Sequence, residues 1–490
     1  MKNPDSIFKK HFENLQNTGE LTDHNATGKD SSLISELLII FNSRIEKNII
    51  SDIRFKAFGC SYSIAASSMM TVLAKGTDLL GAAKITEDDI EDKLGNFPGN
   101  KKDVLKVVLG AFRNMLADHI SKHQDTAMYA RNTKKAAVAM SGGVDSSMVA
   151  KKLKEEGFDI IGMTMRIVPP EQLEKHKLIT QSTSIDIESA YQVCKKLDIP
   201  YFIIDLSSAF EEKIIDHFCT SYLQGLTPNP CIECNKQIKF GLFLKNAEML
   251  GADFMATGHY CRVEKEGDSG TFQVLKGIDR SKDQSYVFWK LDQSQLSRIR
   301  TPLGNFTKEN IKKTSMDFIP FLASKDESQD ICFIPGQNYQ DFLGKKATCI
   351  KEGKIINTSG TEVGRHRGYP YYTIGQRRGL GISHASPLYV IKIIPEDNII
   401  VVGEKNELLK KSMRLKDINF ISGNPPSRQF NAGVKIRYGG SEKPAEIKLT
   451  SGGEASVTFK SDSSSITPGQ SAVFYDGEKL LGGGIIKKQD

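Results

Sequence analysis

The chain has 490 residues, of which 39% are apolar and 26% charged, a balance typical of folded proteins rather than disordered or membrane-embedded ones. This length allows roughly three or four domains with cores of their own. A formal net charge of +7 is compatible with a polyanionic partner but does not require one. No apolar window is long enough to span a membrane, so we expect no membrane partner.

The eight cysteines bear on the compartment. The first ten residues lack the apolar core of a signal peptide, and structural disulfides are rare in reducing compartments. We therefore expect a cytoplasmic protein whose thiols are reactive or bound to metal.

The N-terminal quarter begins with a polar segment. Residues 1–30 are rich in Asn, Asp, Lys and Thr, and we expect them to form a disordered leader. A small α+β domain is expected over 31–125. Apolar spacing predicts a helix over 31–48, alternation predicts a strand over 51–59, and a second helix is expected over 61–74.

Cys60 stands where that second helix begins, a position that favours thiolate. The surrounding motif, from Phe58 to Ser68, resembles the central cysteine motif of the NifU/IscU iron-sulfur scaffold proteins, which assemble a cluster on three cysteines. Neither 43–52 nor 105–111, where the other two cysteines are expected, contains one. The resemblance therefore implies a degenerate scaffold domain that docks a sulfur or cluster donor, with independent cluster assembly as the alternative.

A glycine-rich loop, Met-Ser-Gly-Gly-Val-Asp-Ser-Ser at 140–147, follows a strand predicted over 136–139 and precedes a helix predicted over 148–157. Its two glycines let the backbone approach an anion, while amides at the helix start and three hydroxyls supply donors. The lysine of a P-loop NTPase is missing. A tight turn would explain the glycines but not the hydroxyls, so we interpret the loop as a phosphate cradle. It resembles the PP-loop of ATP pyrophosphatases, which implies cleavage of ATP between its α and β phosphates to adenylate a carbonyl oxygen.

Strands and helices alternate over 131–310. Predicted strands such as 158–165 and 201–206, with helices between them, indicate an α/β domain with a doubly wound parallel sheet. Ligands of such sheets bind at the carboxyl ends of the strands. Met165 and Gly258 stand at two of these ends.

Two cysteines with C-x-x-C spacing, Cys231 and Cys234, follow a Thr-Pro-Asn-Pro turn at 227–230. The prolines prevent a helix before the turn, so the cysteines are expected where a helix begins, which favours thiolate. The spacing alone is typical of both redox pairs and metal ligands. Cys332, far downstream between polar and apolar residues, is a third candidate thiol.

Six motifs in order along residues 134–490 resemble those of the bacterial tRNA-specific 2-thiouridylase (MnmA) family. They are SGGVDSS, TPNPxxxCNKxIKF, ATGHY, KDQSY, SQDICFIPG and YYTIGQRRGLGI. The resemblance implies that ATP, with Mg²⁺, adenylates the 2-carbonyl oxygen of the wobble uridine of tRNA and that sulfur then replaces this oxygen. It also implies a disulfide bond among the features of the family, and a cysteine desulfurase or sulfur relay protein as the sulfur donor.

The resemblance further implies roles for single residues. Cys234 matches the nucleophilic cysteine and Cys332 the cysteine that receives a persulfide, and we expect nearby Lys236 to favour thiolate. The positions that match ATP contacts are Ala139, Met140, Ser141, Gly142, Gly143, Val144, Asp145, Ser146, Met165 and Gly258. The positions that match tRNA contacts are Lys282, Asp283, Gln284, Arg437 and Tyr438.

Cys231 departs from the family pattern, because many members have Asp there. Together with Cys234 and Cys332 it supplies three ligands for a 4Fe-4S cluster whose open iron holds an exogenous sulfur, as in related cluster-dependent tRNA thiolases. The alternative is a persulfide on Cys332. In that case Cys231 is simply an extra thiol at the position where many family members have Asp. The sequence supports the cluster and the persulfide almost equally, with a slight preference for the cluster. A zinc site is a third option, but the sequence has no second C-x-x-C pair to complete it.

A small central domain is expected over 311–385. Its segments 365–369 and 373–379 combine basic, aromatic and glycine residues, a composition typical of contacts with RNA phosphates and bases. An ordinary basic surface would not explain the aromatic residues. Short strands separated by turn signals predict a β-barrel over 386–490, a fold that frequently binds nucleic acids.

The sequence as a whole predicts an ATP-dependent tRNA 2-thiouridylase fused to a degenerate scaffold domain. Two alternatives remain: another PP-loop adenylating ligase, and a sulfur or cluster carrier with a vestigial PP-loop. The first leaves the cysteine motifs and the barrel unexplained. The second predicts that no AMP is released with cognate tRNA.

Overall fold

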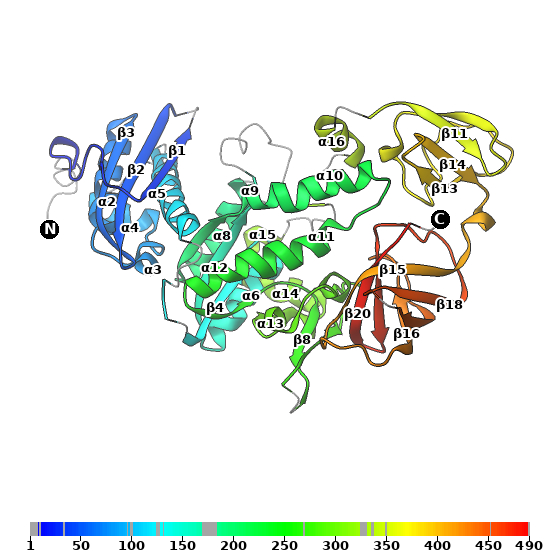
Figure 1. Ribbon diagram of the computed structural model, residues 1–490. Coiled ribbons are helices and arrows are strands. Elements are labelled where there is room, and N and C mark those ends of the chain that lie inside the picture. Colours follow the sequence, from blue (N-terminus) through cyan, green and yellow to red (C-terminus); the bar gives the residue numbers. More distant parts are fainter. Residues whose placement is uncertain are drawn as a thin grey trace.

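The computed structural model describes residues 8, 11–32, 35–95, 97–98, 101–123, 128–130, 132–168, 184–267, 270–323, 331–334, 338–347, 350–450 and 452–488. Figure 1 shows four units in chain order: an α+β domain (blue), an α/β domain (cyan to green), a small domain built on a sheet (yellow) and a β-barrel (orange to red). This architecture confirms the fold class predicted from the sequence. Within the described ranges, no helix combines the length and the apolar character needed to cross a membrane.

The N-terminal domain is a three-stranded antiparallel sheet with packed helices. Its elements are β1 (Ala26–Ser32), β2 (Leu37–Glu46), β3 (Ile49–Phe58), α2 (Ser61–Ala74), α3 (Leu79–Ala82), α4 (Glu87–Leu94) and α5 (Lys102–Lys122). The helix predicted over 31–48 is wrong. Leu37, Ile39 and Phe41 are buried at every second position, the period of a strand, and β2 pairs with both β1 and β3. The same apolar residues also fit helical spacing, so only the pairing with neighbouring strands shows that this segment is a strand and not a helix.

The disordered leader predicted over 1–30 is wrong for much of its length. β1 pairs in register with β2, and before β1 the Gly19 amide donates to the Phe55 carbonyl at 2.9 Å. Gly28 lies so close to α5 that a Cβ would stand 2.1 Å from the Met115 nitrogen. A polar segment is ordered here because both its backbone and its side chains make contacts; the Asn25 amide nitrogen, for example, donates to the Ile45 carbonyl at 2.8 Å.

The second domain contains a parallel sheet, as predicted, and its five strands have the order β10-β7-β4-β5-β6. Its strands are β4 (Asn132–Ala139), β5 (Asp159–Arg166), β6 (Tyr201–Asp205), β7 (Ala252–Ala256) and β10 (Ile299–Arg300). Its helices are α6 (Val144–Glu155), α8 (Ser184–Lys196), α9 (Ser207–Phe210), η2 (Glu211–Ile215), α10 (Asp216–Leu223), α11 (Pro230–Glu233), η3 (Cys234–Phe243), α12 (Leu244–Met249), η5 (Ser285–Phe288), α13 (Gln293–Leu296), η6 (Pro302–Asn305), α14 (Lys308–Phe318) and α15 (Pro320–Ala323). Since α14 packs against α6, this domain continues beyond the predicted boundary at residue 310.

The small central domain has its own four-stranded sheet in the order β12-β11-β14-β13. Its elements are α16 (Tyr339–Lys346), β11 (Gly353–Asn357), β12 (Glu362–His366), η7 (Tyr369–Tyr371), β13 (Tyr389–Ile394), β14 (Ile399–Gly403) and η8 (Lys405–Leu408). The boundary predicted between residues 385 and 386 is therefore wrong. β13 and β14 are strands as predicted, but β14 pairs with β11 and not with the barrel, because a strand pattern does not specify the partner of a strand.

Six strands close the C-terminal barrel, since β15 pairs with both β18 and β20. They are β15 (Lys410–Phe420), β16 (Gln429–Lys435), β17 (Lys443–Leu449), β18 (Ala455–Ser463), β19 (Ser471–Asp476) and β20 (Lys479–Ile486). The hairpin of β8 (Cys261–Lys265) and β9 (Phe272–Lys276) adds to β20. A hairpin that lies between β7 and β10 of the parallel sheet in sequence therefore joins the barrel to the α/β domain.

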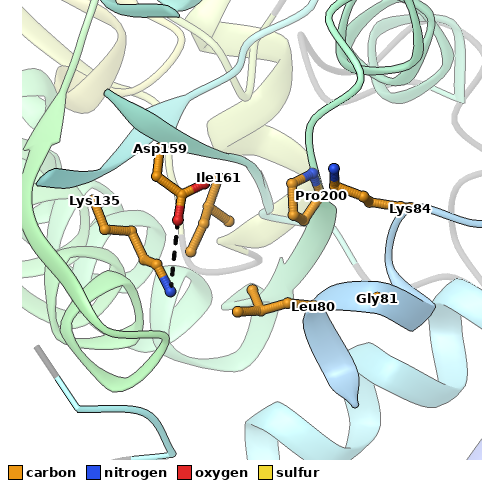
Figure 2. Close-up of a pocket in the computed structure, with 7 residues that line it drawn as sticks. All are labelled: Leu80, Gly81, Lys84, Lys135, Asp159, Ile161 and Pro200. Atoms are coloured by element: carbon orange, nitrogen blue, oxygen red, sulfur yellow. Dashed lines mark ion pairs between the residues drawn. The ribbon is translucent and has the colours of Figure 1, made fainter. Parts of the chain in front are cut away.

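Two of the places where the N-terminal domain contacts the α/β domain involve the strands of the parallel sheet. Helix α5 packs against β6, the edge strand of the parallel sheet. Figure 2 shows the second place, a pocket of about 180 Å³ where α3 meets the amino ends of β4 and β5, with Leu80 facing Ile161 and with Lys135 Nζ 4.0 Å from Asp159 Oδ2. Ligands of parallel sheets bind at the carboxyl ends of the strands, so this pocket lies away from the expected ATP site.

Candidate functional site

The glycine-rich loop of residues 140–147 connects β4 to α6 at the carboxyl edge of the sheet. Gly143 is the N-cap of α6, and Gly142 has a φ of +69°, which favours glycine. A Cβ on Gly142 would also stand 2.3 Å from the Asp186 carbonyl oxygen. The first amides of α6 have no carbonyl partners within the helix, which is the usual basis of an anion site.

Hydroxyl groups fix the shape of this loop. Ser146 Oγ accepts from the Ser141 amide at 3.1 Å, and Ser147 Oγ donates to the Gly143 carbonyl at 2.8 Å. The serines that the sequence predicts as donors to phosphate therefore also shape the loop.

Asp145 in the loop is held by two residues that the sequence analysis missed. Lys308 Nζ lies 2.8 Å from both carboxylate oxygens, and the Tyr260 hydroxyl donates to Oδ1 at 2.8 Å. Lys308 comes from α14, 163 residues downstream, so no local signal connects it with the loop. The loop has a lysine after all, and the tertiary structure supplies it.

The remaining residues predicted to contact ATP gather at the same edge. Ala139 and Met165 are half-buried near the ends of β4 and β5. Gly258 follows β7 and packs against the loop, where a Cβ would stand 2.9 Å from the Asp145 Cβ and 3.2 Å from the Ser146 amide. The structure therefore brings the loop, the ends of three strands and a glycine that permits close approach into one place.

The Thr-Pro-Asn-Pro turn leads into a long helix formed by α11, η3 and α12, as predicted. Asn229 caps this helix by accepting from the Cys231 amide at 3.1 Å, and Pro230 is its first residue. Gln470, in the loop before β19 of the barrel, donates to the Thr227 carbonyl at 3.1 Å. The barrel thus holds the turn that carries the cysteines, a contact that no local motif predicted.

The thiols near this turn differ from the expected thiolates. Burial raises the pKa of Cys234 to about 11. Burial, together with the neighbouring Cys234 and Cys231, also raises the pKa of Cys332. Cys231 is exposed at the surface, yet the surrounding chain removes enough water to raise its pKa as well. Loss of water around the charged form raises the pKa of these thiols more than the dipole at the helix start lowers it. The thiols are therefore neutral at pH 7.

Lys236 is not the cation of this pocket, contrary to the prediction. Its ammonium lies 2.6 Å from Asp292 Oδ2 and 2.8 Å from Gln295 Oε1. Lys239 is the cation whose charge lowers the pKa of Cys231 and Cys234 and partly offsets their burial.

Cys231, Cys234 and Cys332 lie near one another, since the first two each raise the pKa of the third, and the three together are called the thiol pocket. The segment 331–334 is anchored by Phe333, whose ring centroid lies 5.3 Å from that of Phe218 in α10. The flanking motif residues 328–330 and 335–336 lie outside the described residues. Among the described residues, no group of three or more His, Cys, Asp or Glu side chains is arranged to hold a metal ion.

Three of the residues predicted to contact tRNA interact with residues near the phosphate loop or with the thiols. Gln284 Oε1 accepts from the Tyr260 amide at 2.9 Å, and Asp283 Oδ1 accepts from the Gly277 amide at 3.0 Å. Partial burial raises the pKa of Tyr438, and the charges of Asp283 and Cys231 raise it further. Two more of these positions, Lys282 and Arg437, are half-buried and exposed, respectively.

Cys60 does not join this site. It is the N-cap of α2 in the N-terminal domain, which lies at the far left of Figure 1, away from α11. Its neighbour Phe58 is 60% exposed. The single cysteine of the scaffold-like motif therefore belongs to a separate surface.

The fold and the site define a PP-loop nucleotide-binding enzyme that carries three neighbouring thiols. Residues 134–336 match the tRNA methyl transferase HUP domain, 340–404 the tRNA methyl transferase PRC-barrel domain, 410–486 the aminomethyltransferase beta-barrel domain and 5–126 the NifU-like N terminal domain. The tRNA-specific 2-thiouridylase MnmA of Carboxydothermus hydrogenoformans is 42% identical over 358 residues, which cover 73% of this chain and 98% of that protein. The chain belongs to the tRNA-specific 2-thiouridylase (MnmA) family.

Two further similarities were found. The tRNA-specific 2-thiouridylase MnmA of Pelotomaculum thermopropionicum is 43% identical over 354 residues, 72% of this chain and 97% of that protein. A crystal structure of a putative iron-sulfur cluster assembly scaffold protein from Fervidobacterium islandicum is 13% identical and covers 22% of this chain and 90% of that chain, with a TM-score of 0.18. Both resemblances drawn from the sequence are confirmed at the level of the matching families.

Proposed function

We propose that the enzyme adenylates the 2-carbonyl oxygen of the wobble uridine of tRNA at the phosphate loop, and then replaces this oxygen with sulfur at the thiol pocket. One observation carries the proposal: a set of interactions connects the phosphate loop with the thiol pocket. Tyr260 donates to Asp145 of the loop through its hydroxyl and to Gln284 through its amide. Next to Gln284, Asp283 acts on the pKa of Tyr438 together with Cys231 of the thiol pocket.

In the first step, the uridine O2 attacks the α-phosphorus of ATP. A P–O bond forms, the bond to the β-phosphate breaks, and pyrophosphate leaves with its electron pair. The loop amides and Lys308 stabilise the negative charge of the phosphates, and Asp145 fixes the Lys308 ammonium. Mg²⁺ is expected to accompany ATP, as in other enzymes of nucleotide chemistry.

In the second step, the incoming sulfur attacks C2 and AMP leaves with the former carbonyl oxygen. If the sulfur arrives as a persulfide on Cys332, its terminal atom forms the C–S bond. Cys234 then attacks the Cys332 sulfur and its thiol proton passes to the departing base, so that the S–S bond breaks, neutral 2-thiouridine is released and a Cys234–Cys332 disulfide remains. A thiol reductant from the sulfur-donor system, with a cysteine desulfurase or relay protein as donor, restores both thiols.

The donor set also favours a cluster-held sulfur. Cys231, Cys234 and Cys332 supply three thiols in one pocket, although they are not arranged for a single metal ion. In a 4Fe-4S cluster each cysteine binds a different iron, so ligands of a cluster need not converge on one point. When bound, the cluster supplies an open iron that holds exogenous sulfur. Iron would also remove the protons from thiols that burial keeps neutral, which the persulfide route must achieve without a metal.

The test uses the full chain, purified without oxygen, with unmodified tRNA, ATP and either sulfide or a persulfide donor. We expect pyrophosphate release and 2-thiouridine in the digested tRNA. The variant Cys231→Asp restores the residue common in the family. If it loses visible absorption and activity, the cluster route is supported; a colourless wild type that is active with a persulfide donor would overturn that route.

The alternatives give different results in the same assay. A carrier with a vestigial PP-loop releases no AMP with tRNA, and another adenylating ligase releases AMP but forms no 2-thiouridine. Either result would contradict the main proposal.

For the N-terminal domain we propose docking of the sulfur or cluster donor near Cys60. The exposed Phe58 beside it supports a protein contact there. The variant Cys60→Ser should lower 2-thiouridine levels in cells but not in the purified assay with a chemical sulfur source. Unchanged levels in cells would leave Cys60 without a role in sulfur supply.

A further inference from the structure

Polar contacts connect helix α5 of the N-terminal domain with the carboxyl edge of the parallel sheet. Arg166 ends β5, directly after Met165, and its side chain is only 6% exposed. One end of its guanidinium donates to Asn114 Oδ1 in α5 at 2.5 Å, and the other lies 3.3 Å from Asp205 Oδ2 at the end of β6. A residue of the N-terminal domain therefore helps to fix a cation at the edge where ATP is expected.

Asn114 is itself held on both sides. Its amide nitrogen donates to the Lys29 carbonyl of β1 at 2.8 Å, while its oxygen accepts from Arg166. On the other side of Arg166, Asp205 Oδ1 accepts from the amide and the hydroxyl of Ser207 at 3.0 and 2.6 Å. The orientation of Arg166 thus depends on the sheet of one domain and on the strand ends of another.

A second set of contacts extends from α5 toward the phosphate loop. The Arg113 guanidinium stacks 3.5 Å from the centre of the Tyr191 ring in α8, and the Tyr191 hydroxyl donates to Glu87 of α4 at 2.5 Å. The Tyr191 ring lies 6.1 Å from the Tyr201 ring. Tyr201 and Tyr191 are both buried, so a shift of α5 is transmitted to the sheet rather than absorbed by solvent.

Tyr201 completes the connection. Its hydroxyl donates to Thr164 Oγ1 at 2.8 Å, and Thr164 Oγ1 donates to the Met140 carbonyl at 2.8 Å, where the phosphate loop begins. The Tyr201 amide also donates to the Ala83 carbonyl of the N-terminal domain at 3.2 Å. The edge strand β6 is therefore held by the N-terminal domain through its backbone and its side chains.

We infer that the N-terminal domain is a positioning element of the ATP site, in which Asn114 orients Arg166 and Arg113 supports the loop through Tyr191 and Tyr201. This inference rests on the proposed ATP site and gives the domain a role independent of Cys60. Asn114 and Arg113 are positioning residues, because each acts through another residue rather than on the nucleotide.

The test compares variants of the full chain. Asn114→Leu removes the acceptor of Arg166, and we expect kcat/KM for ATP in pyrophosphate release to fall about tenfold, chiefly through KM, since misplaced binding groups weaken binding. Asn114→Asp keeps the oxygen acceptor for Arg166 but loses the donor to the Lys29 carbonyl, so KM should lie between that of Asn114→Leu and that of the wild type. Lys106→Ala, on the exposed side of α5, is the matched control and should equal the wild type.

Two further measurements separate positioning from folding. Hydrogen exchange should increase at residues 140–147 in Asn114→Leu and in Arg113→Met, and thermal unfolding identifies any variant that is simply destabilised. If Asn114→Leu is destabilised, Arg113→Met tests the same inference through the second set of contacts. The inference would be overturned if Asn114→Leu and Arg113→Met both kept the wild-type KM for ATP and the wild-type hydrogen exchange at residues 140–147.

Calorimetric binding of ATP keeps the two proposals distinct. A wild type that binds ATP but forms no 2-thiouridine contradicts the proposed reaction, and the variants then test positioning through Kd. A wild type that binds no ATP overturns both.

Discussion

Lys308 shows how a single residue gains its role from the fold. It lies in α14, far from the glycine-rich loop in sequence, and its ammonium meets both oxygens of Asp145. An aspartate in a phosphate cradle repels the ligand unless its charge is neutralised. The ion pair neutralises Asp145 and places a cation beside the loop.

The variant Lys308→Met should lower kcat/KM for ATP about a hundredfold, because a charge-assisted contact is lost and Asp145 is left unpaired. Pyrophosphate release with unmodified tRNA measures the effect. Lys312→Met, on the exposed face of the same helix, is the control. Equal activity of the two variants would remove Lys308 from the site.

The thiol of Cys234 illustrates the opposite case, in which local sequence misleads. A position near a helix start favours thiolate, but burial raises its pKa to about 11. For a protein without bound metal, alkylation of Cys234 at pH 8 should be about a thousandfold slower than for the full thiolate. The rate should rise about tenfold per pH unit up to pH 10, as mass spectrometry of the labelled peptide can measure.

The same peptide in the unfolded chain is the control, because an unfolded cysteine has an ordinary pKa near 8.5. Rapid alkylation of folded, metal-free Cys234 at pH 7 would contradict the raised pKa and would favour the persulfide route.

At the scale of elements, α5 links two domains and contains a buried titratable group. Burial, together with the charge of the neighbouring His123, lowers the pKa of His119 from 6.5 to about 4. Above pH 6.5 this histidine is neutral in both folded and unfolded chains. As the pH falls toward 4, the unfolded chain binds a proton first, so stability is lost over this window.

We therefore expect the free energy of unfolding to fall between pH 6.5 and pH 4, with His119 accounting for at most about 3 kcal/mol. Hydrogen exchange of α5 amides in a pH series measures the change. His119→Leu should flatten this dependence, whereas His384→Gln, at an exposed position, should not. An unchanged pH dependence in His119→Leu would show that other groups cause it.

Elements also show where periodicity fails. β13 and β14 were correctly predicted as strands, but the sheet they join is that of the central domain. In 31–48 the apolar residues fit both periods, and pairing with two neighbouring strands selected the strand. A local pattern shows which face of an element is apolar. The strands with which the element pairs determine which sheet it joins and what packs on that face.

At the scale of the molecule, the proposed tRNA contacts extend over several domains. Arg377 and Arg378 are exposed in the central domain, in a loop fixed by a hydrogen bond from the Gly375 amide to the Val390 carbonyl at 2.8 Å. Replacing both by alanine should weaken tRNA binding about tenfold and lower the slope of log K against log salt by about 2. Titrations of labelled tRNA at several salt concentrations measure this slope.

Lys56→Ala, in the N-terminal domain, is the control for a lost positive charge. If the double variant keeps the wild-type slope, the two arginines do not contact phosphate, and the basic and aromatic composition of 373–379 has another cause.

The sequence by itself determined the chemistry-bearing residues that lie in contiguous motifs: the loop at 140–147, the cysteines of the Thr-Pro-Asn-Pro turn, and the parallel sheet that holds both. Glycine conformation, helix starts and strand-helix alternation depend on neighbours in the chain, so they can be inferred from it. Only the tertiary structure decided that Lys308 neutralises Asp145, that Gln470 holds the turn, and that Lys239 rather than Lys236 faces the thiols. It also decided that the N-terminal domain reaches the ATP edge through Asn114. Burial sets the charge states of the thiols, and contacts between residues far apart in sequence set the positions of these side chains. The spacing of a local motif specifies neither the burial nor the distant contacts.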